Sequence, residues 1–232
     1  AAGKRDGILS PMTVRRIAVL GAGTMGHGIA HAAASAGYET AMYDVTRAAV
    51  EKGRATIEQV VRKGVDLGKV TAADADVTLA RISISDQIAE ALAGADFVIE
   101  AAPEKIDIKL RLFEDIDRHA PAHAIVTTNT SALSITEMAG ASRKPGRVAG
   151  MHFFNPVHPM KLVEIVRALE SRRATLEAVD AVAKEMGKET VLVRESPGFI
   201  TSRVNVTIGN EAFYMLMEGV ASARDIDKAL KL

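Results

Sequence analysis

The segment Ile17-Ala-Val-Leu-Gly21-Ala-Gly23-Thr-Met-Gly26 decides the fold of this 232-residue chain. Residues 17–20 are all apolar and predict a buried strand, and the apolar pattern that follows the glycines predicts a helix. The glycine spacing fits a tight turn, a close approach of backbone to a pyrophosphate, and close packing of helix on strand. The helix N-terminus would hold the phosphates on its free N–H groups. The cofactor-contacting residues predicted here are Gly21, Ala22, Gly23, Thr24, Met25 and Gly26.

A carboxylate closes the second predicted strand, over residues 39–44, at Asp44, 23 positions after Gly21. A doubly wound fold places at this point the acid that binds the hydroxyls of the adenosine ribose. Because a carboxylate repels a 2′-phosphate, the cofactor predicted is NAD rather than NADP. The alternative is a glycine-rich turn that binds no ligand. The expected spacing of strand, glycines, helix and acid disfavours this alternative.

Strand and helix patterns alternate along the rest of the chain, which predicts a parallel sheet covered on both faces. Further strands are predicted over residues 82–84, 97–100, 124–128, 147–152, 162–166 and 190–193. Helices are predicted from a Thr46 cap to about Lys63 with Gly64 as the stop, from Thr71, from Ser85 to Gly94, from about Lys105 to His119, from Ser134, and over 175–186.

Two features depart from this alternation. The short loop between 147–152 and 162–166 cannot hold a parallel crossover, so these strands should be antiparallel. After Ser196-Pro-Gly198, residues 199–217 form a helix pattern that is apolar on more than one side, which favours burial between partners. A further helix starts at Ser222, and the chain ends inside it at Leu232.

The fold expected is therefore a Rossmann-type doubly wound, mostly parallel α/β sheet with a C-terminal antiparallel hairpin extension, followed by the start of an all-α domain. Residues 1–12 are interpreted as a tail or cloning extension, since Met12 suits a natural start. Residues 13–195 would form the NAD-binding domain. Residues 196–232 would be the first helices of an incomplete dimerisation and substrate domain.

The antiparallel hairpin carries the strongest candidate for catalysis. A turn centred on His158 places His152 directly opposite Glu164, close enough to hydrogen-bond. A carboxylate on one imidazole nitrogen fixes the tautomer and raises the basicity of the other, as a general base for an alcohol requires. Pro156 favours an extended Asn155, whose amide would lie beside the histidine. The alternative is a buried pair that only joins the hairpin, which the neighbouring nicotinamide site disfavours.

Composition limits the remaining functions. The net charge is zero and no basic run is long, so no nucleic-acid partner is expected. No cysteine and no membrane-length apolar run are present, so the chain is expected to be cytoplasmic, without a membrane partner. His27 and His31 have metal-ligand spacing, but no third ligand is evident nearby, and no metal is predicted.

The motifs resemble those of the L-3-hydroxyacyl-CoA dehydrogenase family, and most closely its short bacterial 3-hydroxybutyryl-CoA members. The likeness rests on the glycine loop and on Thr128-Asn-Thr-Ser131, His152-Phe-Phe-Asn-Pro156 with Glu164, and Ser196-Pro-Gly-Phe-Ile200. It implies NAD-dependent oxidation of an L-3-hydroxyacyl-CoA by a homodimer that joins through C-terminal helices.

The resemblance also implies residue roles. His152 would be the base and Glu164 its orienting acid, with Ser131 and Asn155 around the reacting oxygen and the nicotinamide. Glu104 and Lys109 would contact the cofactor, although a helix-start acid and a solvated lysine explain them too. Where some members carry Asn near the substrate, this chain has Ser202.

Two alternative functions remain open: a dehydrogenase of another L-3-hydroxy acid, such as a sugar acid, and a non-catalytic NAD-binding protein. Basic residues on and beyond the second helix fit either the phosphates of CoA or a solvated helix face. They are Lys52, Arg54, Arg62, Lys63 and Lys69.

Overall fold

A computed structural model of the chain describes residues 14–232, which form an eight-stranded sheet in the order β3-β2-β1-β4-β5-β6-β7-β8. The predicted tail over residues 1–12 lies outside the described residues. The strands are β1 (Arg16–Leu20), β2 (Glu39–Tyr43), β3 (Ile82–Ser85), β4 (Phe97–Glu100), β5 (Ile125–Thr128), β6 (Val148–Phe153), β7 (Leu162–Arg167) and β8 (Glu189–Arg194).

Every strand pair is parallel except β6–β7, which is antiparallel and places His152 directly opposite Glu164. The order β3-β2-β1-β4-β5-β6 is that of a dinucleotide-binding doubly wound sheet. The predicted Rossmann-type sheet and its antiparallel extension are confirmed.

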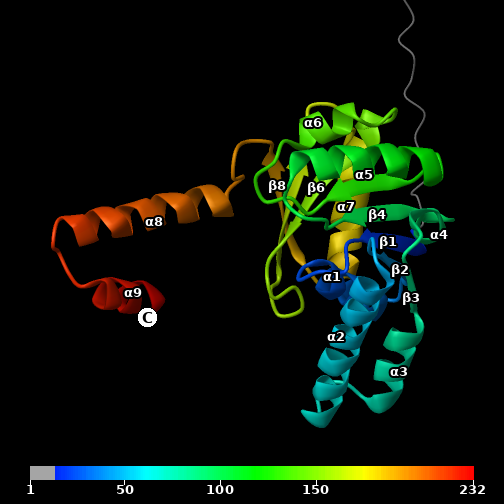
Figure 1. The fold of residues 1–232 in the computed structure, drawn as a ribbon, viewed down its shortest axis with the longest axis horizontal. Helices are drawn as coiled ribbons and strands as arrows, with labels where there is room; N and C mark the ends of the chain where they lie inside the picture. The colour runs from blue at the N-terminus through cyan, green and yellow to red at the C-terminus, as the bar shows by residue number, and fades with distance from the viewer. Residues whose placement is uncertain (1–13) are drawn as a thin grey trace, which may run out of the picture.

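Helices cover both faces of this sheet (Figure 1). Alternate residues of β1 show why: Ile17 and Val19 belong to one apolar cluster, whereas Ala18 and Leu20 belong to the other. The first cluster includes residues of α1 (Gly26–Ser35), α2 (Arg47–Asp66), α3 (Ala72–Ala80) and α7 (Arg173–Glu185). The second includes residues of α4 (Ile88–Leu92), α5 (Ile106–His119) and α6 (Ile135–Gly140), and a 3-10 turn (Pro145–Arg147) follows.

The last two helices, α8 (Thr201–Met217) and α9 (Ala223–Lys231), extend away from the sheet and its covering helices (Figure 1). No residue of α8 is buried, although its sequence is largely apolar. Ser222 caps α9 as expected, accepting a hydrogen bond of 3.2 Å from the Asp225 N–H. Within residues 14–232, no helix has both the length and the apolar character that a membrane span requires.

Two predicted helix boundaries, the end of α2 and the start of α4, are wrong by three residues, whereas the strand ends, the bounds of α5 and α7 and the start of α8 lie within two residues of those expected. The helix α2 continues past Gly64 to Asp66, because Val65 still packs against the first apolar cluster, and the left-handed glycine that follows the helix is Gly68. The helix α4 starts only at Ile88, because a turn precedes it. The helix α8 starts at Thr201 rather than at residue 199, where the backbone φ is +52°.

The loop of the β6–β7 hairpin packs on α1. The imidazoles of His31 and His158 stack at 5.0 Å with 9° between their planes. A side chain at Gly28 would lie only 3.0 Å from Val157, so the loop approaches the helix closely there. The ammonium of Lys188 is buried and donates to the carbonyls of Val157 (2.6 Å) and Met160 (2.9 Å). These contacts join the hairpin to the helix that follows the glycine loop.

The buried imidazole of His31 makes stability depend on pH. Burial, and then the charge of neighbouring His158, lower the pKa of His31 from 6.5 to about 4. Between these values the unfolded chain binds a proton that the folded chain does not, so stability falls as pH drops through this window. We expect His31 to lower the unfolding free energy by roughly 2–3 kcal/mol between pH 7 and pH 4.

Urea denaturation from pH 7 to pH 4 of wild type, His31→Gln and His119→Gln measures this contribution. The His31 variant should show a flatter pH dependence, and the variant of the exposed His119 should follow wild type. An unchanged slope in His31→Gln would contradict the assignment.

Candidate active site

A cavity of about 840 Å³ opens at the carboxyl ends of β1, β2, β4, β5 and β6, where doubly wound sheets bind ligands. Ala22, Gly26 and Glu164 do not line it, because each lies buried behind the wall. The predicted site residues that do line the cavity are Gly21, Gly23, Thr24, Met25, Asp44, Glu104, Lys109, Ser131, His152 and Asn155.

The glycine loop fits a dinucleotide. Gly21 has a φ of +110°, and a Cβ there would lie 2.5 Å from the Ala101 carbonyl oxygen. A Cβ on Gly26 would lie 1.7 Å from the Gly21 carbonyl oxygen, so helix and turn touch. Gly23 has nothing within 4 Å of such a Cβ and faces the cavity. Protein packing therefore explains Gly21 and Gly26, whereas the absence of a side chain at Gly23 leaves room for the pyrophosphate.

Asp44 lies where the acid for the ribose hydroxyls is expected, just past the end of β2. Its Oδ2 accepts the N–H of Ala22 and its Oδ1 that of Val45, both at 2.8 Å. The carboxylate thus joins the glycine loop to the β2 end and still lines the cavity. Both oxygens keep lone pairs for hydroxyl donors, which fits a ribose diol.

His152 and Glu164 form a buried pair at the cavity wall. The Nδ1 of His152 lies 2.8 Å from the Oε2 of Glu164, and the glutamate side chain is fully buried. With the carboxylate ionised, Nδ1 carries the proton and Nε2 keeps a free lone pair. The rings of Phe154 and Phe199 pack against the imidazole at 4.5 and 5.7 Å. The arrangement can accept a proton from a group in the cavity.

A second charged network lies behind the loops that follow β4 and β5. The Lys109 ammonium is buried and contacts both oxygens of fully buried Glu100, at 2.7 and 2.8 Å. Glu100 also accepts the Thr128 hydroxyl at 2.5 Å and the Ala102 N–H at 2.6 Å. The alternative interpretation of Lys109 as a solvated helix lysine is therefore wrong.

Glu104 connects this network to Ser131. It accepts the Ser131 N–H at 2.9 Å and the Thr130 hydroxyl, and lies 3.5 Å from the Lys109 ammonium. Burial works against the charged form, but the Thr130 hydroxyl and the lysine outweigh it and hold the pKa of Glu104 below its usual value. Sequence reasoning missed Glu100 and Thr128. The one available signal for Glu100 was an acid ending a wholly apolar strand.

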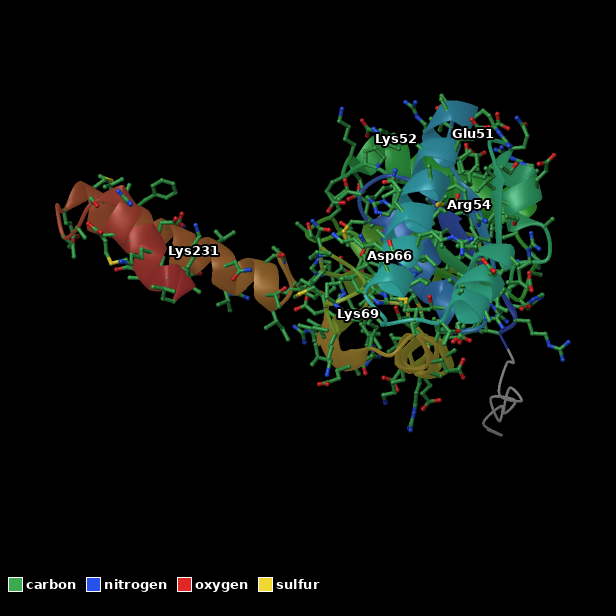
Figure 2. All side chains as sticks on the ribbon, turned by 90° about the horizontal axis from the view of Figure 1, so that it is seen from below. Glu51, Lys52, Arg54, Asp66, Lys69 and Lys231 are labelled. Atoms are coloured by element: carbon green, nitrogen blue, oxygen red, sulfur yellow. The ribbon has the colours of Figure 1, made fainter. Side chains whose placement is uncertain are left out.

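Lys52, Arg54 and Lys69 are spread along α2 and the turn that follows it (Figure 2). Arg54 donates to the Ile82 carbonyl at 3.0 Å, and Arg62 pairs with Asp76 at 2.7 Å. Lys52, Lys63 and Lys69 are exposed. Both interpretations of this surface, as a CoA phosphate contact and as a solvated face, stay open.

The two α1 histidines have partners other than a metal. The Nδ1 of His27 lies 2.7 Å from the Gly23 carbonyl oxygen, and His31 stacks on His158. In the part of the chain that the structure describes, no three His, Cys, Asp or Glu side chains converge as a metal site.

Sheet order, glycine loop and Asp44 define a Rossmann-type dinucleotide-binding protein. Residues 16–196 match the family described as "3-hydroxyacyl-CoA dehydrogenase, NAD binding domain", and residues 198–232 match its C-terminal domain. The chain belongs to the 3-hydroxyacyl-CoA dehydrogenase family, which comprises NAD-dependent oxidoreductases.

Individual relatives agree with this assignment. The chain is 44% identical to a probable 3-hydroxybutyryl-CoA dehydrogenase of Bacillus subtilis, over 95% of this chain and 77% of that one. It is 41% identical to the 3-hydroxyadipyl-CoA dehydrogenase of Escherichia coli, over 95% of this chain and 46% of that one. The crystal structure of (S)-3-hydroxybutyryl-CoA dehydrogenase from Ralstonia eutropha superposes with a TM-score of 0.91 at 42% identity, covering 95% of this chain and 77% of that one.

The glycine loop yields a test that separates ligand contact from packing. Gly23→Ala should leave the melting temperature unchanged but weaken NADH binding about tenfold, because the new methyl enters the space for the pyrophosphate. Gly26→Ala should instead destabilise the fold by about 1–3 kcal/mol, because its methyl meets the Gly21 carbonyl.

NADH fluorescence titration and thermal unfolding measure the two effects. Gly140→Ala is the matched control, since it also has open space around an added Cβ but lies outside the cavity lining. Wild-type NADH affinity in Gly23→Ala would refute the placement of the pyrophosphate.

Proposed function

We propose that this protein oxidises a short-chain L-3-hydroxyacyl-CoA, such as L-3-hydroxybutyryl-CoA, to the 3-oxoacyl-CoA. His152 would act as the general base and Glu164 as the acid that orients it. The observation that carries the proposal is the 2.8 Å contact between His152 Nδ1 and Glu164 Oε2, in the wall of the cavity that Gly23 and Asp44 also line.

The base works through its free nitrogen. The Nε2 of His152 accepts the substrate's hydroxyl proton while Glu164 stabilises the imidazolium that forms. Such base catalysis is typically worth about 10²–10⁴-fold. The packed rings of Phe154 and Phe199 shield the pair from water, which strengthens its electrostatic coupling. In the reverse direction the imidazolium returns the proton, and Ser131 and Asn155 donate hydrogen bonds to the substrate oxygen.

The cofactor would bind along the cavity floor. The glycine loop would hold the pyrophosphate, Asp44 the adenosine ribose, and the Glu104–Lys109 pair with Ser131 the nicotinamide half. When bound, NAD supplies the acceptor for the hydride that leaves the carbinol carbon. The fit of Gly23 and Asp44 to these groups supports this placement.

Relatives with 3-hydroxybutyryl-CoA dehydrogenase in their names support the short acyl chain. A cytoplasmic location stays a prediction, since the relatives include both bacterial and mitochondrial proteins.

Removal of the base tests the proposal directly. His152→Gln should lower turnover with NADH and acetoacetyl-CoA by about 10²–10⁴-fold, because no group remains to carry the proton. NADH affinity should be retained, since the glycine loop and Asp44 are untouched. Glu164→Gln should also lower turnover, because a neutral amide no longer stabilises the imidazolium.

Steady-state NADH consumption and NADH fluorescence give the two readouts, with exposed His119→Gln as the matched control. A free L-3-hydroxy sugar acid is the second substrate tested, in the oxidation direction. Turnover of the sugar acid but not of acetoacetyl-CoA would assign the enzyme to a sugar-acid substrate. Undiminished activity in His152→Gln would refute the mechanism.

We also propose that the chain forms a homodimer through its C-terminal helices. The support is the apolar, unburied surface of α8, which a second copy would cover. Its exposed large side chains are Val204, Val206, Ile208, Phe213, Tyr214, Leu216 and Met217.

A charge introduced on this surface tests the dimer. Phe213→Glu should convert a dimer into a monomer in light scattering coupled to gel filtration, because the carboxylate cannot be desolvated in an apolar interface. Asn210→Glu adds the same charge at an exposed polar position of the same helix and should remain dimeric. A monomeric wild type would contradict the proposal.

A further inference from the structure

The segment that leads into α8 returns to the His152–Glu164 pair after β8. Phe199 is 4% exposed, and its ring packs edge-on against the His152 imidazole at 5.7 Å. Its φ of +52° lies in the left-handed region, which is uncommon for a bulky residue. Such a conformation persists where its surroundings require it, and here it brings the start of α8 against Glu164.

Three donors from the start of α8 reach the Glu164 carboxylate. Its Oε1 accepts the N–H groups of Ile200 and Thr201 at 3.2 and 3.0 Å. The Thr201 hydroxyl lies 3.2 Å from Oε2. This is the oxygen that His152 Nδ1 contacts at 2.8 Å, so hydroxyl and imidazole share one acceptor atom.

These donors oppose protonation of the imidazole. Each points the positive end of an N–H or O–H dipole at the carboxylate, and the α8 N-terminus adds a positive potential of its own. They stabilise the ionised carboxylate and weaken its attraction for a positive charge on His152. The donors therefore favour the arrangement in which the imidazole can accept a proton.

We propose that Thr201 is a positioning residue that sets the proton affinity of His152 through the shared oxygen of Glu164. The inference rests on the proposed role of His152 as the base. Because Thr201 is also the first residue of α8, the orientation of the helical segment is coupled to the protonation of the pair: a shift of α8 against β7 breaks all three contacts.

Other charged groups around the pair stay constant in the test. The remaining ionisable side chains that line the cavity are Tyr43, Asp44, Glu104, Lys109, Arg111 and Asp115. On α8, the first charged residue is Arg203, which is exposed and lies 3.4 Å from the Ser196 hydroxyl. None of these is altered in the variants below.

Three threonine variants of the full chain isolate the hydroxyl. Thr201→Val keeps the shape and removes the donor, whereas Thr201→Ser keeps the donor. Thr207→Val is the matched control on the same helix, where the hydroxyl donates only to the Arg203 carbonyl at 3.1 Å. The His152 imidazole is titrated by NMR in ligand-free protein, with its signals assigned from His152→Gln, and the pH profile of kcat/KM for oxidation is measured in parallel.

We expect Thr201→Val to raise the NMR midpoint and the acidic limb of the kcat/KM profile by about 0.5–1 pH unit. Thr201→Ser and Thr207→Val should stay within about 0.2 pH unit of wild type. If Thr201→Val fails to fold, Thr201→Ala serves as the second variant without a hydroxyl. Midpoints that coincide with wild type in the folded valine or alanine variant would overturn the inference.

The two readouts distinguish this inference from the proposed function. Full turnover in His152→Gln would refute the catalytic role of the pair, and with it the functional meaning of Thr201. Loss of turnover in His152→Gln combined with an unshifted titration in Thr201→Val would refute the role of Thr201 alone.

Discussion

The hydrogen bond between His152 and Glu164 is the contact on which the proposed chemistry depends. Only an antiparallel pair can bring residues 12 positions apart into direct opposition, so this bond requires the one reversal in an otherwise parallel sheet. A fully buried carboxylate is costly unless donors satisfy it. The chain supplies them from the start of α8, which explains why the backbone turns sharply at Phe199 before that helix begins.

The second requirement is that the base faces the dinucleotide loop. The hairpin loop contacts α1 through the stacked pair of His31 and His158 and through Val157 against Gly28. Because α1 begins directly after the glycine loop, these contacts fix the position of the hairpin that carries His152 relative to the expected pyrophosphate site. The buried ammonium of Lys188 holds the loop's carbonyls and keeps this arrangement ordered.

Local patterns in the sequence were enough to predict the sheet and the opposition of His152 and Glu164. The glycine spacing and Asp44 predicted the doubly wound fold, and the symmetry of one short turn predicted that His152 faces Glu164. Features that depend on segments far apart in sequence were missed. The Glu100–Lys109 pair needs the position of α5 over β4, and the end of α2 depends on the packing of Val65 against the first apolar cluster. The roles of Ser131, Asn155, Glu104 and Lys109 came from family resemblance and stay predictions, although one cavity brings all four together.

A crystal structure of the chain with NADH and acetoacetyl-CoA bound would show directly whether His152 contacts the reacting oxygen. We expect the 3-oxo oxygen to lie about 2.6–3.2 Å from Nε2 of His152, while Nδ1 keeps its bond to Glu164. A substrate whose oxygen lies beyond hydrogen-bond reach of His152, with the nicotinamide correctly seated beside it, would contradict the assignment of this histidine as the base.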